Sequence, residues 1–235
     1  MKAYGQFCPL AQATQLLCER WTLLVIRELI AGSTRFSTLQ KGVPLMSPSL
    51  LSKRLKQLAE AGIIDCQKEG GTIRYTLTNA GRELRPIVEL MGAWGHRWAQ
   101  SELNEDDLDA GLLMWDMRRS VDPAVFPAHR VVVQFEYPDA PKGARDWWLI
   151  AENGEVDLCL NDPGYEVDIL IRSPLQVMTA VWTCKQEFDK AVSQGKMQVM
   201  GDRKLTRNLQ RWIRSSLLSR LGTVTEIPAV NWPAV

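Results

Sequence analysis

The stretch Met46-Ser-Pro-Ser-Leu-Leu-Ser-Lys-Arg-Leu-Lys-Gln-Leu-Ala-Glu-Ala-Gly-Ile-Ile64 decides how the first half of the chain folds. Ser47 is a good helix cap and Pro48 suits the first helical position, so a helix is expected to begin here. Leucines recur at helical spacing and would face a core, and Gly62 ends the helix. These leucines are Leu51, Leu55 and Leu58.

The opposite side of this helix carries hydroxyl and basic side chains, namely Ser49, Ser52, Lys53 and Lys56. Residues 64–69 and 72–77 then predict two strands joined by Gly70-Gly71, a typical hairpin turn. A capped helix with a basic outer face, followed at once by a small hairpin, is the recognition unit of a winged helix-turn-helix. The predicted partner is therefore double-stranded DNA.

The flanking sequence predicts further helices over 9–19, 21–30 and 35–41, and a long helix from Thr78 to about Gln100. This last helix has an apolar stripe, which we interpret as the interface of a homodimer. The alternative is that the stripe packs on the second half of the same chain. The stripe consists of Leu84, Ile87, Val88, Met91, Trp94 and Trp98.

Charge and composition separate the two halves of the 235-residue chain. Residues 1–100 hold 13 Lys and Arg against 7 Asp and Glu, whereas residues 101–235 hold 15 against 20. A basic first half and an acidic second half suggest that the first half meets the polyanion.

The first residues lack the pattern of a signal segment, and no apolar run approaches the ~20 residues that span a bilayer. Five cysteines without metal-ligand spacing favour a cytoplasmic protein with reduced thiols, no metal and no cofactor.

The candidate DNA contacts lie on the predicted recognition helix and hairpin. Early exposed side chains of such a helix meet base edges, which nominates Ser49, Ser52 and Lys53 beside the capping Ser47. Lys56 would contact phosphate, and Arg54 would either reach phosphate or pair within the domain. On the hairpin, Lys68 and Arg74 suit phosphate or the minor groove. The alternative for each cation is a solvated surface charge.

The first hundred residues resemble the HxlR-type transcriptional regulators. The resemblance rests on Cys8-Pro9, on the runs 20–29 (RWTLLVIREL) and 35–39 (RFSTL), on 47–64, and on 75–81 (YTLTNAG). It implies a homodimeric DNA-binding regulator paired through the first and last helices of this domain. One departure from the family pattern is the short turn at Gly70-Gly71-Thr72.

Cys8 falls where the first helix would have its N-cap. The helix dipole favours a thiolate there, and in some HxlR-type regulators the cysteine at this position senses oxidants or electrophiles. The alternative is a small, partly buried interface residue. Both interpretations stay open on the sequence alone.

The second half predicts strands over 131–137, 147–151, 156–160 and 167–171 as a meander, helices over 174–182 and 186–193, a strand over 197–200 and a helix over 204–221. It resembles the sterol-carrier-protein fold in Trp148-Leu-Ile150 before Asn153-Gly154, in 167–171 and in 195–202 (GKMQVMGD). That resemblance implies an apolar tunnel, with a solid core as the alternative. Its candidate lining comprises Trp147, Trp148, Met178, Trp182, Phe188 and Met197.

The expected fold class is α+β, with an N-terminal winged helix-turn-helix domain followed by a sterol-carrier-like sheet-and-helix domain. The expected divisions are a DNA-binding and dimerisation domain at 1–100, a linker and connecting helix at 101–129, the second domain at 130–221 and a tail at 222–235. The expected function is a non-enzymatic, homodimeric regulator that reads an inverted repeat and binds an apolar effector. The alternatives are a thiol-based sensor acting through Cys8, and a lipid-carrier or accessory protein.

Overall fold

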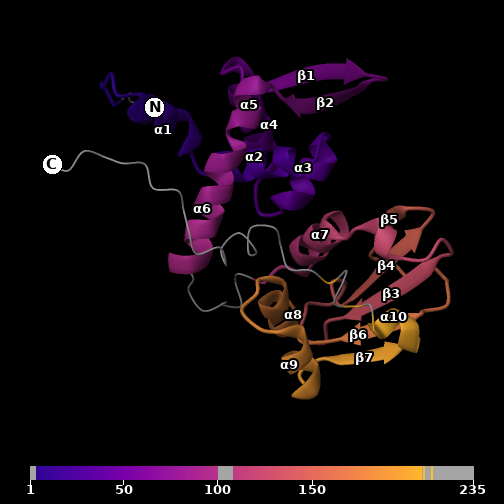
Figure 1. Cartoon of the computed structure of the whole chain (residues 1–235). Coiled ribbons are helices and arrows are strands. Elements are labelled where there is room, and N and C mark those ends of the chain that lie inside the picture. The colour runs from indigo at the N-terminus through magenta and orange to yellow at the C-terminus, as the bar shows by residue number, and fades with distance from the viewer. Residues whose placement is uncertain (1–3, 100–107, 208, 210–212, 214–235) are drawn as a thin grey trace. The chain divides into compact units, whose positions relative to one another are not determined.

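The computed structural model describes residues 4–99, 108–207, 209 and 213. The chain forms two compact units, Met1–Glu89 and Leu90–Val235. Figure 1 labels their helices and strands. The expected tail at 222–235, most of the helix expected at 204–221 and the acidic segment 101–107 lie outside the described residues.

The first unit has the element order of a winged helix. Helices α1 (Pro9–Leu17), α2 (Thr22–Ile30), α3 (Phe36–Gly42) and α4 (Pro48–Glu60) precede the hairpin β1 (Ile64–Glu69) and β2 (Thr72–Leu77). The hairpin has the bounds that the sequence predicts. The core gathers α2, α3, α4 and the start of β1 through Ile26, Leu39, Leu55 and Ile64.

The long helix expected from Thr78 onward is divided in two, so that prediction was wrong. Helix α5 (Asn79–Glu83) has Leu84 as its C-cap residue, and α6 (Arg85–Trp98) follows. Pro86 explains the break, because proline lacks the N–H that would bond to Arg82 and its ring crowds that carbonyl group. Thr78 does cap α5, since its Oγ1 accepts a hydrogen bond from the Gly81 N–H at 3.1 Å.

The second unit begins at α7 (Ala110–Ser120) and a short 3-10 turn (Pro123–Val125). Its five strands are β3 (Val131–Glu136), β4 (Asp146–Glu152), β5 (Glu155–Cys159), β6 (Ile169–Arg172) and β7 (Gln198–Gly201). Its other helices are α8 (Leu175–Trp182), α9 (Phe188–Ser193) and α10 (Arg203–Arg207).

The strand order β5-β4-β3-β6-β7 departs from the expected meander. β6 does not pair with β5; it crosses over and runs parallel to β3, with Val133 opposite Ile169. Residues 160–168 make this crossover, and the result buries Ile169 and Ile171 beside β3.

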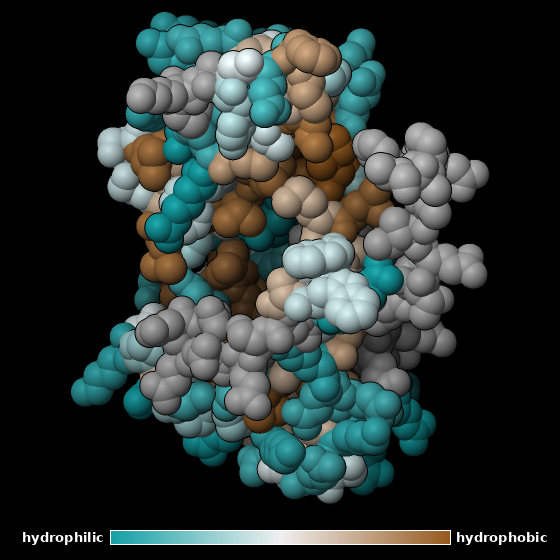
Figure 2. Space-filling model, turned by 90° about the vertical axis from the view of Figure 1, so that its left-hand side faces the viewer, coloured by the Kyte–Doolittle hydropathy of each residue, from teal (hydrophilic) through white to brown (hydrophobic). Residues whose placement is uncertain are grey.

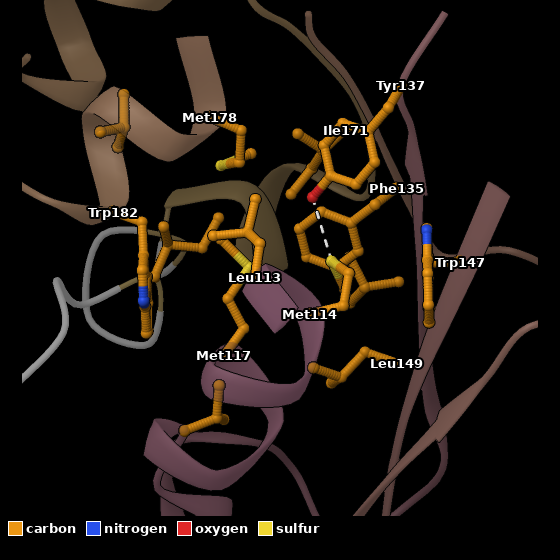
Figure 3. Close-up of a cluster of buried hydrophobic side chains, with 14 of the residues drawn as sticks. Leu113, Met114, Met117, Phe135, Tyr137, Trp147, Leu149, Ile171, Met178 and Trp182 are labelled. Carbon is orange, nitrogen blue, oxygen red and sulfur yellow. Dashed lines mark hydrogen bonds between the residues drawn. The ribbon is translucent and has the colours of Figure 1, made fainter. Parts of the chain in front are cut away.

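One face of this sheet packs against the helices. Leu113, Met114 and Met117 of α7 belong to the same buried cluster as Phe135 of β3 and Trp182 of α8 (Figure 3). Helix α7, expected as part of the connecting segment, therefore contributes to the core of the second unit. The Tyr137 hydroxyl donates a hydrogen bond to Met114 Sδ at 3.0 Å, and complete burial raises the pKa of Tyr137 far above its usual range.

Candidate nucleic-acid interface

Helix α4 presents one face to the core and the other to solvent. Leu51, Leu55 and Leu58 are buried, as the spacing predicts. The helix begins because the Leu50 N–H donates to Ser47 Oγ at 3.3 Å and Pro48 occupies the first turn. The solvent face therefore has a defined orientation with respect to the domain.

Most of the predicted contact residues lie on this solvent face. Ser49, Ser52, Lys53 and Lys56 are exposed. Lys56 Nζ lies 3.7 Å from Glu60 Oε1, a loose surface ion pair. Ser47 is exposed but has a structural task, since its hydroxyl caps α4 and lies 3.2 Å from Ser49 Oγ.

Arg54 differs from its neighbours, because its guanidinium turns back into the domain. It forms an ion pair with Glu19, its Nε donates to the Arg20 carbonyl oxygen at 3.2 Å, and its Nη1 donates to Gln57 Oε1 at 2.6 Å. Its side chain is 11% exposed. Of the two sequence interpretations of Arg54, the structure supports pairing within the domain, and Arg54 leaves the set of candidate phosphate contacts.

The hairpin carries the remaining predicted cations. Lys68 is exposed on β1, and Arg74 on β2 pairs with Glu69 at 3.0 Å. The Tyr75 N–H donates to the Thr34 carbonyl oxygen at 2.8 Å, which ties the hairpin to the start of α3.

The same edge brings in Arg35, which sequence analysis missed. Arg35 is exposed and forms an isolated antiparallel bridge with Arg74. The backbone of Arg35 is thus paired with the middle of β2. No local spacing could have indicated this, because the two residues are distant in the chain.

The hairpin also carries a free cysteine, Cys66. Partial burial, and then the charge of Asp65, raise the pKa of Cys66. Tyr75 faces Cys66 across the hairpin, and burial and that thiol raise the Tyr75 pKa as well.

Cys8 is the N-cap residue of α1, where the sequence predicts it. Its side chain makes no capping hydrogen bond, and the residue is half-buried. Helix α1 buries none of its residues, and Phe7 beside Cys8 is 96% exposed. The environment of Cys8 is therefore open to solvent on one side.

Helix α6 exposes most of the apolar stripe. Val88 alone is buried, whereas Trp94 and Trp98 are 56% and 73% exposed. Ile87, Leu90 and Met91 are exposed as well. Figure 2 shows hydrophobic residues, coloured brown, on the surface that forms the left-hand side of Figure 1.

The predicted pocket residues of the second unit fall into two groups. Trp147, Met178, Trp182 and Met197 belong to the buried cluster on the helix-covered face, and Phe188 packs against it. Trp148 lies on the opposite face of β4, between Gln134 and Cys159, and cannot line the same space. Successive side chains of a strand point to opposite faces, so the sequence alone could have placed Trp147 and Trp148 on different sides of the sheet.

Two of these tryptophans have polar partners that sequence analysis did not foresee. Trp182 Nε1 donates to Asp116 Oδ2 at 2.7 Å, and Asp116 also pairs with Arg119. Trp147 Nε1 donates to the Ala144 carbonyl oxygen at 2.8 Å. The gap between Met117, Phe135, Leu149 and Trp182 is too small for a water molecule.

Within the described residues, no group of three or more His, Cys, Asp and Glu side chains is arranged to hold a metal ion. None of the helices in the described part of the chain is long and apolar enough to cross a membrane.

The capped helix, the hairpin tied to residue 34 and their exposed cations define a winged helix-turn-helix domain of the kind found in transcriptional regulators. Residues 16–103 match the model of the HxlR-like helix-turn-helix family. The chain belongs to this family through its N-terminal part.

The sequence relatives are named as HTH-type transcriptional regulators. The chain is 36% identical over 110 residues to the HTH-type transcriptional regulator sll1512 of Synechocystis, covering 46% of this chain and 82% of that protein. It is 33% identical over 97 residues to the HTH-type transcriptional regulator YodB of Bacillus subtilis, and the match covers 40% of this chain and 87% of YodB. A solved structure of YodB in its reduced form is 31% identical to this chain. The match covers 40% of this chain and 97% of the YodB chain, with a TM-score of 0.36.

Proposed function

We propose that this protein is a homodimeric transcription regulator that binds an inverted repeat through α4 and its symmetry mate. The observation that carries the proposal is the solvent face of α4, where Ser49, Ser52 and Lys53 are exposed at the N-terminal end of a capped helix. This end of a recognition helix meets base edges in the major groove. Lys56, Lys68, Arg74 and Arg35 supply positive charge for phosphate contacts.

Selection of bound sites from random double-stranded DNA tests this proposal directly. The full chain should enrich an inverted repeat, and gel shifts with that repeat should weaken steeply as salt rises. If no sequence is enriched and binding does not depend on salt, the protein-binding accessory function becomes the better account.

The proposed dimer rests on the apolar stripe of α6 and on the exposed apolar residues of α1. Ile87, Met91, Trp94 and Trp98 would lose solvent contact in a dimer, which is favourable by ~25 cal/mol per Å² of buried apolar area. Two recognition helices about one DNA turn apart, roughly 34 Å, would then read both half-sites. Sedimentation should show a dimer at micromolar concentration, and Trp94→Lys should shift it towards monomer; a wild-type monomer that binds a single half-site would contradict the proposal.

A second candidate function is thiol-based sensing through Cys8. The N-cap position, the half-buried side chain and the exposed residues beside it favour this alternative. A helix N-terminus stabilises a thiolate, which is the reactive form.

For the second unit we propose the sterol-carrier-like interpretation, with an apolar effector as its ligand. Five strands with helices on one face support it. The tightly filled space beside Trp182 implies that such a ligand would have to displace side chains. Titration of sterols, fatty acids and aromatic hydrocarbons, followed by intrinsic tryptophan emission and melting temperature, tests this. Quenching with a raised melting temperature supports a ligand site, and no response across the panel leaves a structural module.

A further inference from the structure

The turn between α3 and α4 displays an apolar side chain beside the proposed DNA contacts. Leu45 is 79% exposed, and Pro44 before it is exposed as well. They precede Ser47 and Ser49, the exposed hydroxyl residues at the start of α4. An exposed leucine therefore stands just before the cap of the recognition helix.

Both ends of this turn are anchored in the core of the first unit. Val43 and Met46 are each 1% exposed and belong to its buried cluster. The Met46 N–H donates to the Val43 carbonyl oxygen at 3.0 Å, which closes a β-turn with Pro44 and Leu45 at its two central positions. Proline also fixes one backbone angle of the turn. The tip that carries Leu45 is therefore held in place with respect to α4.

The side chain of Gln40 on α3 holds the same turn from within the domain. Its Nε2 donates to the Val43 carbonyl oxygen at 3.2 Å and to the Met46 carbonyl oxygen at 2.7 Å. Its Oε1 is buried and has no hydrogen-bond partner among the described residues, so the turn alone orients the amide group. Gln40 thus clamps the residues on either side of Pro44 and Leu45.

A leucine held in this way suits one chemical group of the major groove. Phosphate oxygens and most groups on the base edges are polar, and a leucine side chain neither donates nor accepts a hydrogen bond. The C5-methyl group of thymine is the apolar group displayed there, and apolar side chains contact it. A side chain that is already positioned loses less conformational entropy when it makes such a contact.

We propose that Leu45 selects a thymine in each half-site by contacting its C5-methyl group, and that Gln40 acts as a positioning residue for Leu45. This contact rests on the proposed function, because it requires the N-terminal end of α4 to enter the major groove. It adds an apolar base contact from the turn to the polar contacts proposed for α4. The selected thymine lies beside the bases that Ser49 meets.

Replacement of thymidine by deoxyuridine tests the contact, because it removes the C5-methyl group and keeps every hydrogen-bonding group of the base. Each thymine of the selected repeat is replaced in turn, in both half-sites, and the affinity of the full chain is measured by gel shift. At one position the loss of the methyl group should weaken binding roughly fourfold for each half-site that the protein occupies.

Two variants assign the effect to the turn. Leu45→Ser should bind the thymine and deoxyuridine repeats equally well at that position, whereas Leu160→Ser, which changes an exposed leucine of the second unit, should keep the wild-type preference. Gln40→Met has a similar volume and lacks both donors, so it should lose most of the preference. Circular dichroism checks the folding of each variant.

The outcomes separate this contact from the proposed function. Sequence-specific binding with no methyl-sensitive thymine, or a folded Leu45→Ser that keeps the preference, would overturn the role of Leu45 alone. A folded Gln40→Met with the wild-type preference would overturn the positioning role. A wild-type protein that binds no DNA sequence specifically would refute the proposed function and the thymine contact together.

Discussion

The buried carboxylate of Glu28 on α2 lies directly against the α-carbon of Gly42 at the end of α3. Arg27 joins them, because its Nη2 donates to Glu28 Oε1 at 2.9 Å and to the Gly42 carbonyl oxygen at 2.8 Å. A methyl group at Gly42 would overlap the Glu28 carboxylate. Glycine is thus required here by a close approach of two helices and not by an unusual backbone angle.

Gly42→Ala should destabilise the first unit by about 1–3 kcal/mol, since the crowded carboxylate must move in a packed interior. Gly95→Ala is the matched control, because Gly95 is also helical and a methyl group there meets open space. That control should be neutral or slightly stabilising. Thermal unfolding of both variants measures the difference, and equal melting temperatures would contradict the packing described.

Ser47→Ala should cost about 1 kcal/mol of stability, because it removes the acceptor for the Leu50 N–H. Ser47→Asp should restore the cap, and with it the unfolding midpoint in urea. Ser47→Asp should nevertheless bind DNA more weakly than the wild type, because it adds a negative charge at the proposed interface. If Ser47→Asp recovers both stability and DNA affinity, Ser47 acts through the cap alone and does not lie near phosphate.

Lys53→Ala should weaken specific DNA binding by an amount on the order of 1–3 kcal/mol if Lys53 contacts a base. Lys142→Ala, an equivalent loss of charge at an exposed position of the second unit, is the control. Gel-shift titrations on the selected site and on a mutated site separate base reading from charge. Unchanged affinity and site preference would remove Lys53 from the interface.

Cys8→Ser should leave DNA binding intact under reducing conditions, because serine caps a helix N-terminus at least as well. Oxidant or quinone treatment then distinguishes the two interpretations of Cys8. Release of the wild type but not of the variant from DNA would establish the sensor. The same response in both proteins would refute it. Cys66 should react slowly in parallel thiol labelling, since its pKa is raised.

Trp182→Phe should destabilise the second unit by about 1–3 kcal/mol, because it leaves one oxygen of Asp116 without its indole partner. Phenylalanine is also smaller than tryptophan, so the loss combines the missing hydrogen bond with a small cavity beside Met117 and Phe135. Asp116→Asn keeps an acceptor for the indole and serves as the comparison. Asp116→Asn should therefore lose less stability than Trp182→Phe, and unchanged stability in Trp182→Phe would show that this contact contributes nothing measurable.

Short-range patterns in the sequence were sufficient for the recognition helix and the hairpin. The Ser47 cap, the leucine spacing and the Gly70-Gly71 turn depend on residues a few positions apart, so their physical consequences can be read locally. The break at Leu84 is equally local, since Pro86 disfavours a continuous helix, but the apolar stripe runs across the break and predicts a single helix.

Tertiary structure alone decided which of several possible partners each residue has. Arg54 could have met phosphate or a carboxylate, and Glu19, far away in the sequence, is what turns it inward. The place of β6 beside β3, and the meeting of Arg35 with Arg74, also join distant segments. Such choices follow from how the whole chain buries its apolar faces, which local spacing does not encode.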